Sequence, residues 1–332
     1  MTTKPLQKTF LKAEFNDILG QNAIKDDVKS ALSAGRHIIL VGAPGIGKTT
    51  LAKNIAKTLP TLELNDCGYN CLPDKPICPN CTTNKKTQTK KNNPLNRFIR
   101  IQGSPDLTAE DLIGDIDPIK ALKYGPLSIE AFTPGKIFKA NNGVLFFDEL
   151  NRCNEKLQNT LLQVLEEGKA TIGSYNLDFT ADFIFVGTMN PEDSSTEPLS
   201  DVLLDRFDMI YVQYPESLEI EQQIVHQHGL KAIDFPEKIL VRVLTFIRNL
   251  RAHPDVEKKP SVRASLGLYE RAQTHAILQG KKIVEMEDVL AVLVSVLAHR
   301  IRLKHSVKYL KSPENFIQAE FESFIADTGG YL

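Results

Sequence analysis

The feature that most constrains the fold is a glycine-rich turn between an apolar strand and a helix. The run Ile38–Val41 is short and wholly apolar, and residues 49–59 place Leu51, Ile55 and Leu59 on one helical face. A strand, a loop and a helix in this order open a βαβ unit, which predicts a parallel sheet. The turn and its first helical residues are Gly42, Ala43, Pro44, Gly45, Ile46, Gly47, Lys48, Thr49 and Thr50.

This turn fits the pattern G-x-x-x-x-G-K-[ST], in the strand and helix context that the pattern requires. Its glycines let backbone N–H groups turn inward around phosphates, and the helix N-terminus adds a positive dipole end. We expect Lys48 to contact the β- and γ-phosphates and the Thr49 hydroxyl to hold Mg²⁺. The alternative is a chance match in a surface loop. The sequence therefore predicts an ATP and Mg²⁺ site formed by residues 42–50.

Further apolar runs extend the sheet. They predict strands at residues 98–101, 144–147, 183–186 and 209–212, with helical patterns between most of them. After Pro215 no run predicts a strand, and helical periodicity covers residues 218–228, 237–251, 265–278 and 286–301, with one more amphipathic helix in the tail 312–332. The predicted class is α/β: a nucleotide-binding domain over residues 1–214, followed by a small all-α domain and tail over residues 215–332.

Polar residues end two of these strands. Asp148 and Glu149 follow the run Val144–Phe147, and Asn190 follows the strand that begins near Phe183. Ligands bind at the carboxyl ends of parallel strands, so Asp148 can orient Mg²⁺ and Glu149 can polarise the attacking water. Asn190 can bond the γ-phosphate or position the water. The structural alternatives are that the two acids cap the next helix and that Asn190, which precedes a proline, only forms a turn.

Four of the five cysteines lie within fifteen residues, at Cys67, Cys71, Cys78 and Cys81. Two cysteine pairs joined by a short loop suit a tetrahedral Zn²⁺, and no residue here offers an open catalytic position. We therefore predict a structural zinc site in an insertion over about residues 65–95. An iron–sulfur cluster, or a redox pair at Cys78 and Cys81, is the alternative. Cys153 stands apart as an ordinary packed cysteine.

A basic segment follows the cysteines. Residues 82–105 contain Lys85, Lys86, Lys90, Lys91, Arg97 and Arg100, with an acid only at Asp106 beyond them. Such a segment can contact nucleic acid or an acidic partner. A solvated flexible loop is the favoured alternative, because aromatic residues for base stacking are missing between Thr82 and Arg97.

Composition narrows the class of protein. The chain has 332 residues, with 40 Lys and Arg against 41 Asp and Glu and a formal net charge of −1. This length suits about two domains of roughly 150 residues, and the balanced charge argues against disorder and against a surface that coats nucleic acid. The most apolar stretch, Val289–Ala298, is about half a membrane span. We therefore expect a cytoplasmic protein without membrane insertion.

With these elements in this order, the chain resembles the AAA+ ATPases, and more narrowly the MoxR and magnesium-chelatase ATPase-subunit group. The resemblance runs from about Phe15 to His305. The segments that carry it are residues 17–21, 104–107, 111–114, 132–135, 148–152, 203–207, 261–265 and 296–300. The cysteine insertion is the main departure from the general pattern of the family.

The resemblance implies further assignments. Residues from Ile18 to Gly20 would lie near the adenine. Arg206 would be an arginine finger that reaches the γ-phosphate of the neighbouring subunit, and Arg263 would be a second sensor acting in its own or a neighbouring subunit. Residue types alone also allow Arg206 to pair with Asp205 or Asp208, and Arg263 to be an ordinary surface residue. The segments 108–135 and 170–178 would be an insertion and a hairpin that engage partners, and Arg152 is left unassigned.

The expected function is that of an ATP-hydrolysing, ring-forming motor with a chaperone-like remodelling role. The resemblance implies a hexamer and a separate partner protein with a von Willebrand factor A domain; the client is unknown. The alternatives are the ATPase subunit of a magnesium or cobalt chelatase, a helicase-like motor that acts on nucleic acid, and a module that binds ATP with little hydrolysis. The complete set Lys48, Asp148, Glu149, Asn190 and Arg206 disfavours the last alternative.

Overall fold

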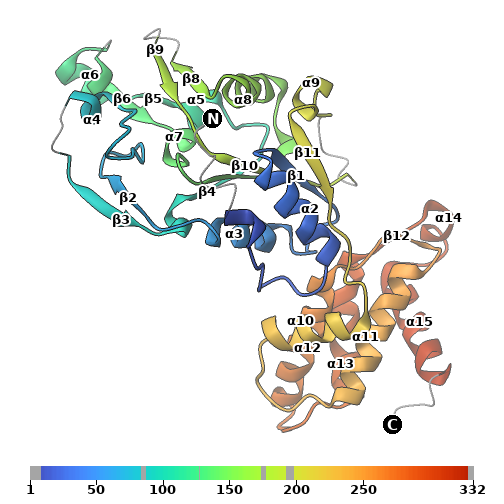
Figure 1. Cartoon of the computed structure of the whole chain (residues 1–332). Helices are drawn as coiled ribbons and strands as arrows, with labels where there is room; N and C mark the ends of the chain where they lie inside the picture. Colours follow the sequence, from blue (N-terminus) through green and yellow to red (C-terminus); the bar gives the residue numbers. More distant parts are fainter. Residues whose placement is uncertain (1–8, 84–86, 127, 173–176, 192–197, 328–332) are drawn as a thin grey trace. The chain divides into compact units, whose positions relative to one another are not determined.

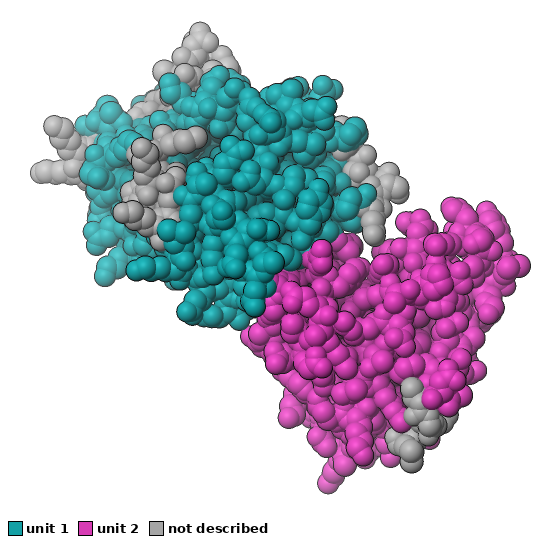
Figure 2. Space-filling model, turned by 45° about the vertical axis from the view of Figure 1, so that its right-hand side comes forward, with its two compact units in different colours: residues 1–18, 22–42, 47–212 teal, residues 19–21, 43–46, 213–332 magenta. Residues whose placement is uncertain are grey.

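The structure is a computed structural model that describes residues 9–83, 87–126, 128–172, 177–191 and 198–327. The chain forms two compact units (Figure 2). Unit 1 comprises the described part of residues 1–18 with residues 22–42 and 47–212, and unit 2 comprises residues 19–21, 43–46 and the described part of residues 213–332. Lys85 and Lys86 of the basic segment lie outside the described residues.

A five-stranded parallel sheet forms the centre of unit 1 (Figure 1). Its order is β11-β1-β10-β7-β4, and every neighbouring pair is parallel. The strands are β1 (His37–Val41), β4 (Phe98–Gln102), β7 (Val144–Asp148), β10 (Ile184–Met189) and β11 (Phe207–Tyr211). The middle residues of β1, β7 and β10 are all buried, as expected for a sheet that is covered on both faces. All five predicted strands are confirmed.

Helices and short strands complete unit 1. The larger helices are α2 (Asn22–Ser33), α3 (Lys48–Lys57) and α8 (Glu155–Glu167), and the shorter ones are α4 (Pro79–Thr83), α5 (Ala109–Ile113), α6 (Pro118–Tyr124), α7 (Lys136–Lys139) and α9 (Asp201–Leu204). Among the described residues of unit 1, three antiparallel pairs stand outside the sheet: β2 (Leu62–Asn65) with β3 (Thr89–Asn92), β5 (Gly114–Ile116) with β6 (Phe132–Pro134), and β8 (Lys169–Ile172) with β9 (Leu177–Thr180). The β8–β9 pair confirms the hairpin expected near residues 170–178.

Unit 2 is mainly helical. Its helices are α10 (Leu218–His228), α11 (Glu237–Ala252), α12 (Val262–Leu278), α13 (Met286–Leu297), α14 (His305–Lys308) and α15 (Pro313–Asp327). The prediction that no strand follows Pro215 is wrong in one detail, because β12 (Val256–Lys258) pairs with β13 (Arg302–Leu303). Strands of two and three residues are too short to show an alternating pattern, so no sequence signal indicates them.

A buried ion pair organises the start of α12. Glu221 of α10 is fully buried and accepts two hydrogen bonds from the guanidinium of Arg251, at 2.7 and 2.6 Å. Its Oε1 also accepts the Ser265 hydroxyl, and Arg251 donates to the carbonyl of Pro260 at 2.8 Å. A bidentate pair of this kind fixes geometry, because loss of either partner would leave a buried charge without compensation. The pair therefore fixes the position at which α12 begins. It thereby also fixes the backbone position of Arg263, which lies on the first turn of this helix.

Candidate active site

The glycine-rich turn has the backbone that phosphate binding requires. Gly42, Gly45 and Gly47 all have positive φ, at 153°, 79° and 99°. A side chain at such positions is strained, so these glycines allow the loop to curl back on itself. The N–H of Gly42 donates to the carbonyl of Met189 at 3.1 Å, which joins the start of the loop to the end of β10.

Helix α3 begins directly after this loop, at Lys48. Its first N–H groups have no helical partner, and the helix dipole favours an anion at this end. Lys48 Nζ donates to the Gly42 carbonyl at 2.7 Å, which keeps the ammonium group folded over the loop. Thr49 and Thr50 occupy the first turn of α3, as the sequence predicted.

The two acids at the end of β7 are held by a neighbouring strand. The Thr188 hydroxyl, buried in β10, donates to Asp148 Oδ1 at 2.6 Å and accepts the backbone N–H of Glu149 at 2.9 Å. Glu149 has a φ of 56°, which is uncommon for a residue with a side chain and costs about 1 to 3 kcal/mol. Thr188 therefore fixes both the Asp148 carboxylate and the strained backbone of Glu149.

Cationic and amide side chains also contact the two acids. Arg100 Nη2 lies 2.6 Å from Asp148 Oδ2, and Gln102 Nε2 donates to Glu149 Oε2 at 2.8 Å. Arg152 Nη1 lies 2.8 Å from the same Glu149 oxygen. Sequence reasoning assigned no site role to Thr188, Arg100 or Gln102. The available signal was that residue 100 lies on a predicted strand and residue 102 directly beyond its end, but the sequence does not reveal which strand is its neighbour.

Close backbone packing completes this edge of the sheet. The N–H of Gly103 donates to the Asp148 carbonyl at 2.7 Å. A Cβ atom at Gly103 would lie only 2.1 Å from the carbonyl oxygen of Glu149, so a larger residue would displace the acid. The carbonyl of Asn190 accepts a hydrogen bond from Asn151 Nδ2 at 3.2 Å, which places Asn190 beyond the end of β10, where the sequence predicted it.

Arg206 makes ion pairs within its own chain. Its guanidinium lies 3.2 Å from Asp205 Oδ2 and 3.1 Å from Glu166 Oε1. Pairing with Asp205 was one of the two structural alternatives, and the other acid, Asp208, is paired with Arg36 at 3.1 Å. The arginine-finger role of Arg206 stays a prediction, because it concerns a neighbouring subunit.

Two separate contacts within unit 2 involve residues that the sequence predicted for the site. A Cβ atom at Gly45 would lie 2.7 Å from Ser261 Oγ and 3.1 Å from Arg263 Cδ, so the exposed Arg263 passes beside the glycine-rich turn. Gly20 has a φ of 64°, and its missing Cβ leaves room for Ile220 of α10. Ile18 is buried.

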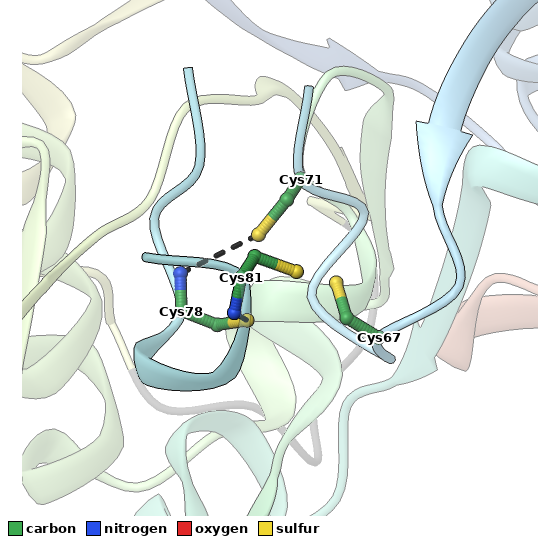
Figure 3. Close-up of side chains that lie close together, drawn as sticks. All are labelled: Cys67, Cys71, Cys78 and Cys81. Atoms are coloured by element: carbon green, nitrogen blue, oxygen red, sulfur yellow. Dashed lines mark hydrogen bonds between the residues drawn. The ribbon is translucent and has the colours of Figure 1, made fainter. Parts of the chain in front are cut away.

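The four clustered cysteines converge on one point (Figure 3). Their sulfur atoms all lie within 4.8 Å of one another, and all five cysteines are free thiols. Tetrahedral Zn–S bonds of about 2.3 Å place the sulfurs about 3.8 Å apart, so a contraction of at most about 1 Å would complete the site. Cys67, Cys71, Cys78 and Cys81 therefore form a donor set that fits Zn²⁺.

Polar hydrogens surround the sulfur atoms. The N–H groups of Ile77 and Cys78 both donate to Cys71 Sγ at 3.4 Å, and that of Cys81 donates to Cys78 Sγ at 3.4 Å. Contacts among the thiols lower the pKa of Cys67 well below its usual value, and the contact with Cys67 raises the pKa of Cys71 to about 11. The N–H donors to the Cys71 and Cys78 sulfurs stabilise the thiolate form that a metal requires.

The favoured interpretation of residues 82–105 as a flexible loop is wrong for their described part. This part contains β3 and β4, and Arg97 is fully buried, where it donates to the carbonyls of Asn142 and Pro60. Burial lowers the pKa of Arg97 to about 10. Lys90 pairs with Asp66 at 2.5 Å. Arg97 therefore belongs to the core and Lys90 pairs within the chain, which sequence spacing could not reveal.

The fold and the site together define the class of protein to which the chain belongs. A parallel sheet, a glycine-rich loop that opens a helix, and paired acids at the end of a strand of the same sheet are the parts of a P-loop nucleoside triphosphatase. Comparison with known families agrees with this class. The ATPase family associated with various cellular activities (AAA) matches residues 77–209, the AAA lid domain matches residues 248–320, and magnesium chelatase subunit ChlI matches residues 14–72.

The chain belongs to the AAA+ ATPases, with an AAA lid domain and a ChlI-like segment. It is similar to the uncharacterized protein YeaC of Bacillus subtilis, with 26% identity over 84% of this chain and 82% of the relative. It is also similar to the magnesium-chelatase subunit ChlI homolog of Methanocaldococcus jannaschii, with 27% identity over 87% of this chain and 86% of the relative. The family binds and hydrolyses ATP with Mg²⁺.

Solved structures support the fold. A RuvB mutant of Thermotoga maritima aligns with a TM-score of 0.53 at 18% identity, over 97% of this chain and 86% of that chain. Among the described residues, no helix combines the length and apolar character needed to cross a membrane.

Proposed function

We propose that this ATPase is a MoxR-like motor that uses ATP hydrolysis to remodel a partner protein. The observation that carries the proposal is helix α6, which lies in the segment between β4 and β7 and has no buried residue. Ile119 and Leu122 lie three residues apart on this helix, with 79% and 91% of their surfaces exposed. Adjacent apolar side chains on one exposed helical face favour contact with a polypeptide.

The catalytic roles are proposed from the site geometry. Lys48, the N–H groups of the loop and Thr50 would hold the triphosphate, while Thr49 and Asp148 would supply the hard oxygen ligands that Mg²⁺ prefers. Glu149 would accept a proton from the attacking water, and Asn190 would position that water or the γ-phosphate. Lys48 and Arg100 would leave their present partners, the Gly42 carbonyl and Asp148, when the phosphates and the metal enter.

Assembly is proposed to complete the site. We propose that the chain forms a hexameric ring in which Arg206 reaches the γ-phosphate of the neighbouring subunit. Its pairs with Asp205 and Glu166 lie at the surface, where an ion pair contributes about 0 to 1 kcal/mol, so they would break readily. We propose that Arg263, beside the glycine-rich turn, is the second sensor, and that Ile18 and Gly20 lie near the adenine.

Several finer features belong to the same proposal. The domain limits would be residues 1–214 and 215–332, and a separate protein with a von Willebrand factor A domain would be the partner. The four cysteines would hold a structural Zn²⁺, which their geometry and N–H donors support. A cytoplasmic location stays an expectation from the composition.

A chelatase ATPase subunit is the second candidate function. The ChlI match over residues 14–72 and the ChlI relatives favour it. A helicase-like motor has less support. The similarity to RuvB concerns the fold alone, and among the described basic residues Arg97 lies in the core and Arg100 is paired with Asp148.

The test is capture with a variant that binds ATP but cannot split it. Glu149→Gln should hold its client in the presence of ATP, because the general base is missing while the phosphate site is intact. Lys48→Ala is the matched control that should hold nothing, and Glu149→Gln with Leu122→Asp should lose the client if α6 contacts it. ATPase stimulation by a purified von Willebrand factor A protein would support remodelling. Stimulation by single-stranded DNA, or normal turnover of Glu149→Gln, would contradict the proposal.

A further inference from the structure

The loop between the first two cysteines, which we call the docking loop, contacts the segment that leads into β7. It consists of Gly68, Tyr69 and Asn70. Asn141 Nδ2 donates to the Tyr69 carbonyl at 3.2 Å, and Asn142 Nδ2 donates to the Asn70 carbonyl at 3.0 Å. Both asparagines lie in the turn between α7 and β7, residues 140–143, which we call the α7–β7 turn.

Side chains of the loop strengthen the same contact. Asn70 Nδ2 donates to the carbonyl of Lys139, the last residue of α7, at 2.5 Å. The Tyr69 ring lies 5.5 Å from the Phe138 ring, which is in turn 6.4 Å from Phe132 in an edge-on arrangement. Phe132 is the first residue of β6. The chain of ring contacts therefore connects the docking loop with the strand that follows α6.

The α7–β7 turn is a junction of several segments. The Oδ1 atom of Asn141 accepts the N–H of Asp182, at 2.8 Å, and the N–H of Asn142 donates to the Asp182 carbonyl at 2.8 Å. Buried Arg97 donates to the Asn142 carbonyl. Through these hydrogen bonds the α7–β7 turn connects the docking loop and the segment before β10 to the start of β7.

We propose that Zn²⁺ held by Cys67, Cys71, Cys78 and Cys81 is a clamp that fixes the base of the segment bearing α6. This proposal rests on the proposed zinc site. Cys67 and Cys71 flank the docking loop, so a bound metal holds both ends of this loop. The metal thereby reduces the conformational freedom that the loop would otherwise lose on packing against the α7–β7 turn. Asn70 also has a φ of 50°, a strained conformation that a free loop would leave.

The clamp acts on β5 and β6 as well as on the turn. The position of a Cβ atom at Gly68 lies 3.8 Å from Pro134, the last residue of β6. β6 pairs with β5 at Gly114, Asp115 and Ile116, and the two strands flank α6 in the sequence. Without the metal, the docking loop should detach and the β5–α6–β6 segment should become more mobile, while unit 2 should be unaffected.

Metal analysis and hydrogen exchange on the full chain test this proposal. One zinc per chain should be present in the native protein and absent from Cys67→Ser. Amides of residues 112–124 and 132–143 should then exchange at least about fivefold faster in Cys67→Ser than in the native protein, with α11 unchanged as the internal reference. An absence of zinc, or another metal in its place, would overturn the zinc assignment itself.

A second variant separates the clamp from the metal and from folding. Asn70→Gly keeps all four cysteines and tolerates a positive φ, but it removes the hydrogen bond to Lys139. Its zinc content should be unchanged and residues 132–143 should exchange about two- to threefold faster. If zinc is present and exchange over residues 132–143 stays at the native rate in Asn70→Gly, the clamp is refuted. That result would leave the zinc site and the motor function standing, because neither client nor nucleotide enters the measurement.

Discussion

Replacing Thr188 by valine should disable catalysis while leaving nucleotide binding nearly intact. Valine has the same shape but lacks the hydroxyl that donates to Asp148 Oδ1 at 2.6 Å and accepts the Glu149 N–H at 2.9 Å. A hydrogen bond to a charged group contributes about 1.5 to 3 kcal/mol and a neutral one about 0.5 to 1.5 kcal/mol. Together they amount to about 2 to 4.5 kcal/mol that holds the two acids in place.

The magnitude follows from this sum. Each 1.36 kcal/mol corresponds to a factor of about ten in rate, so a full loss of positioning would lower kcat by about 30-fold to about 2,000-fold. The effect should fall on kcat rather than on KM for ATP, because the glycine-rich loop and Lys48 do not contact Thr188 in the described hydrogen bonds. Thr188→Ser, which restores the hydroxyl, should recover most of the lost rate.

Steady-state ATPase kinetics across the Mg²⁺ range provide the assay. Thermal unfolding of both variants is the control, because a buried N–H without a partner also lowers stability. If Thr188→Val retains native kcat while remaining folded, Thr188 does not position the acids. If Thr188→Ser is as impaired as Thr188→Val, the loss comes from packing and not from the hydroxyl.

Two further predictions follow from the site and the core. Arg206→Ala should bind ATP but lose hydrolysis, and mixing it with Lys48→Ala subunits should partly restore ATPase activity; a mixture as inactive as its components would place Arg206 outside the neighbouring site. Partly buried His37 accepts the Phe185 N–H at 3.1 Å, and loss of hydration lowers its pKa from 6.5 to about 4. Neutral His37 contributes its full stabilisation of the folded state above pH 6.5. This stabilisation is lost as the pH falls from 6.5 toward 4, because in that range His37 binds a proton in the unfolded state but not in the folded state. This loss amounts to about 3 kcal/mol. His37→Asn, whose side-chain oxygen can accept the same bond, should lose less stability over this range in denaturant titrations, and equal losses would refute the assignment.

Local patterns in the sequence were enough to predict the sheet and the candidate site. A buried parallel strand needs a continuous apolar run, and all five runs form strands of one sheet. The glycines of the loop were predictable because their positive φ values exclude other residues, and the acids were predictable because they follow a strand. The four cysteines were predictable as a group because metal ligands have characteristic spacing, and their sulfurs converge as expected.

Contacts across the sheet were decided only by tertiary structure. Arg100 is 48 residues from Asp148 in the chain, and Thr188 is 40 residues from it. The sequence determines which face of a strand a side chain occupies, but the order and register of strands decide which strand end it meets. For the same reason Arg97, predicted in a basic loop, lies in the core.

Sequence by itself therefore determined the elements, the phosphate loop, the acids and the thiol donors, since each depends on residues close together in the chain. The tertiary structure alone decided that Thr188 holds both acids, that Arg100 and Arg152 neutralise them, and that the loop between Cys67 and Cys71 docks on the α7–β7 turn. These contacts join segments that are distant in the chain, and only the packing of the whole fold brings such segments within hydrogen-bonding distance.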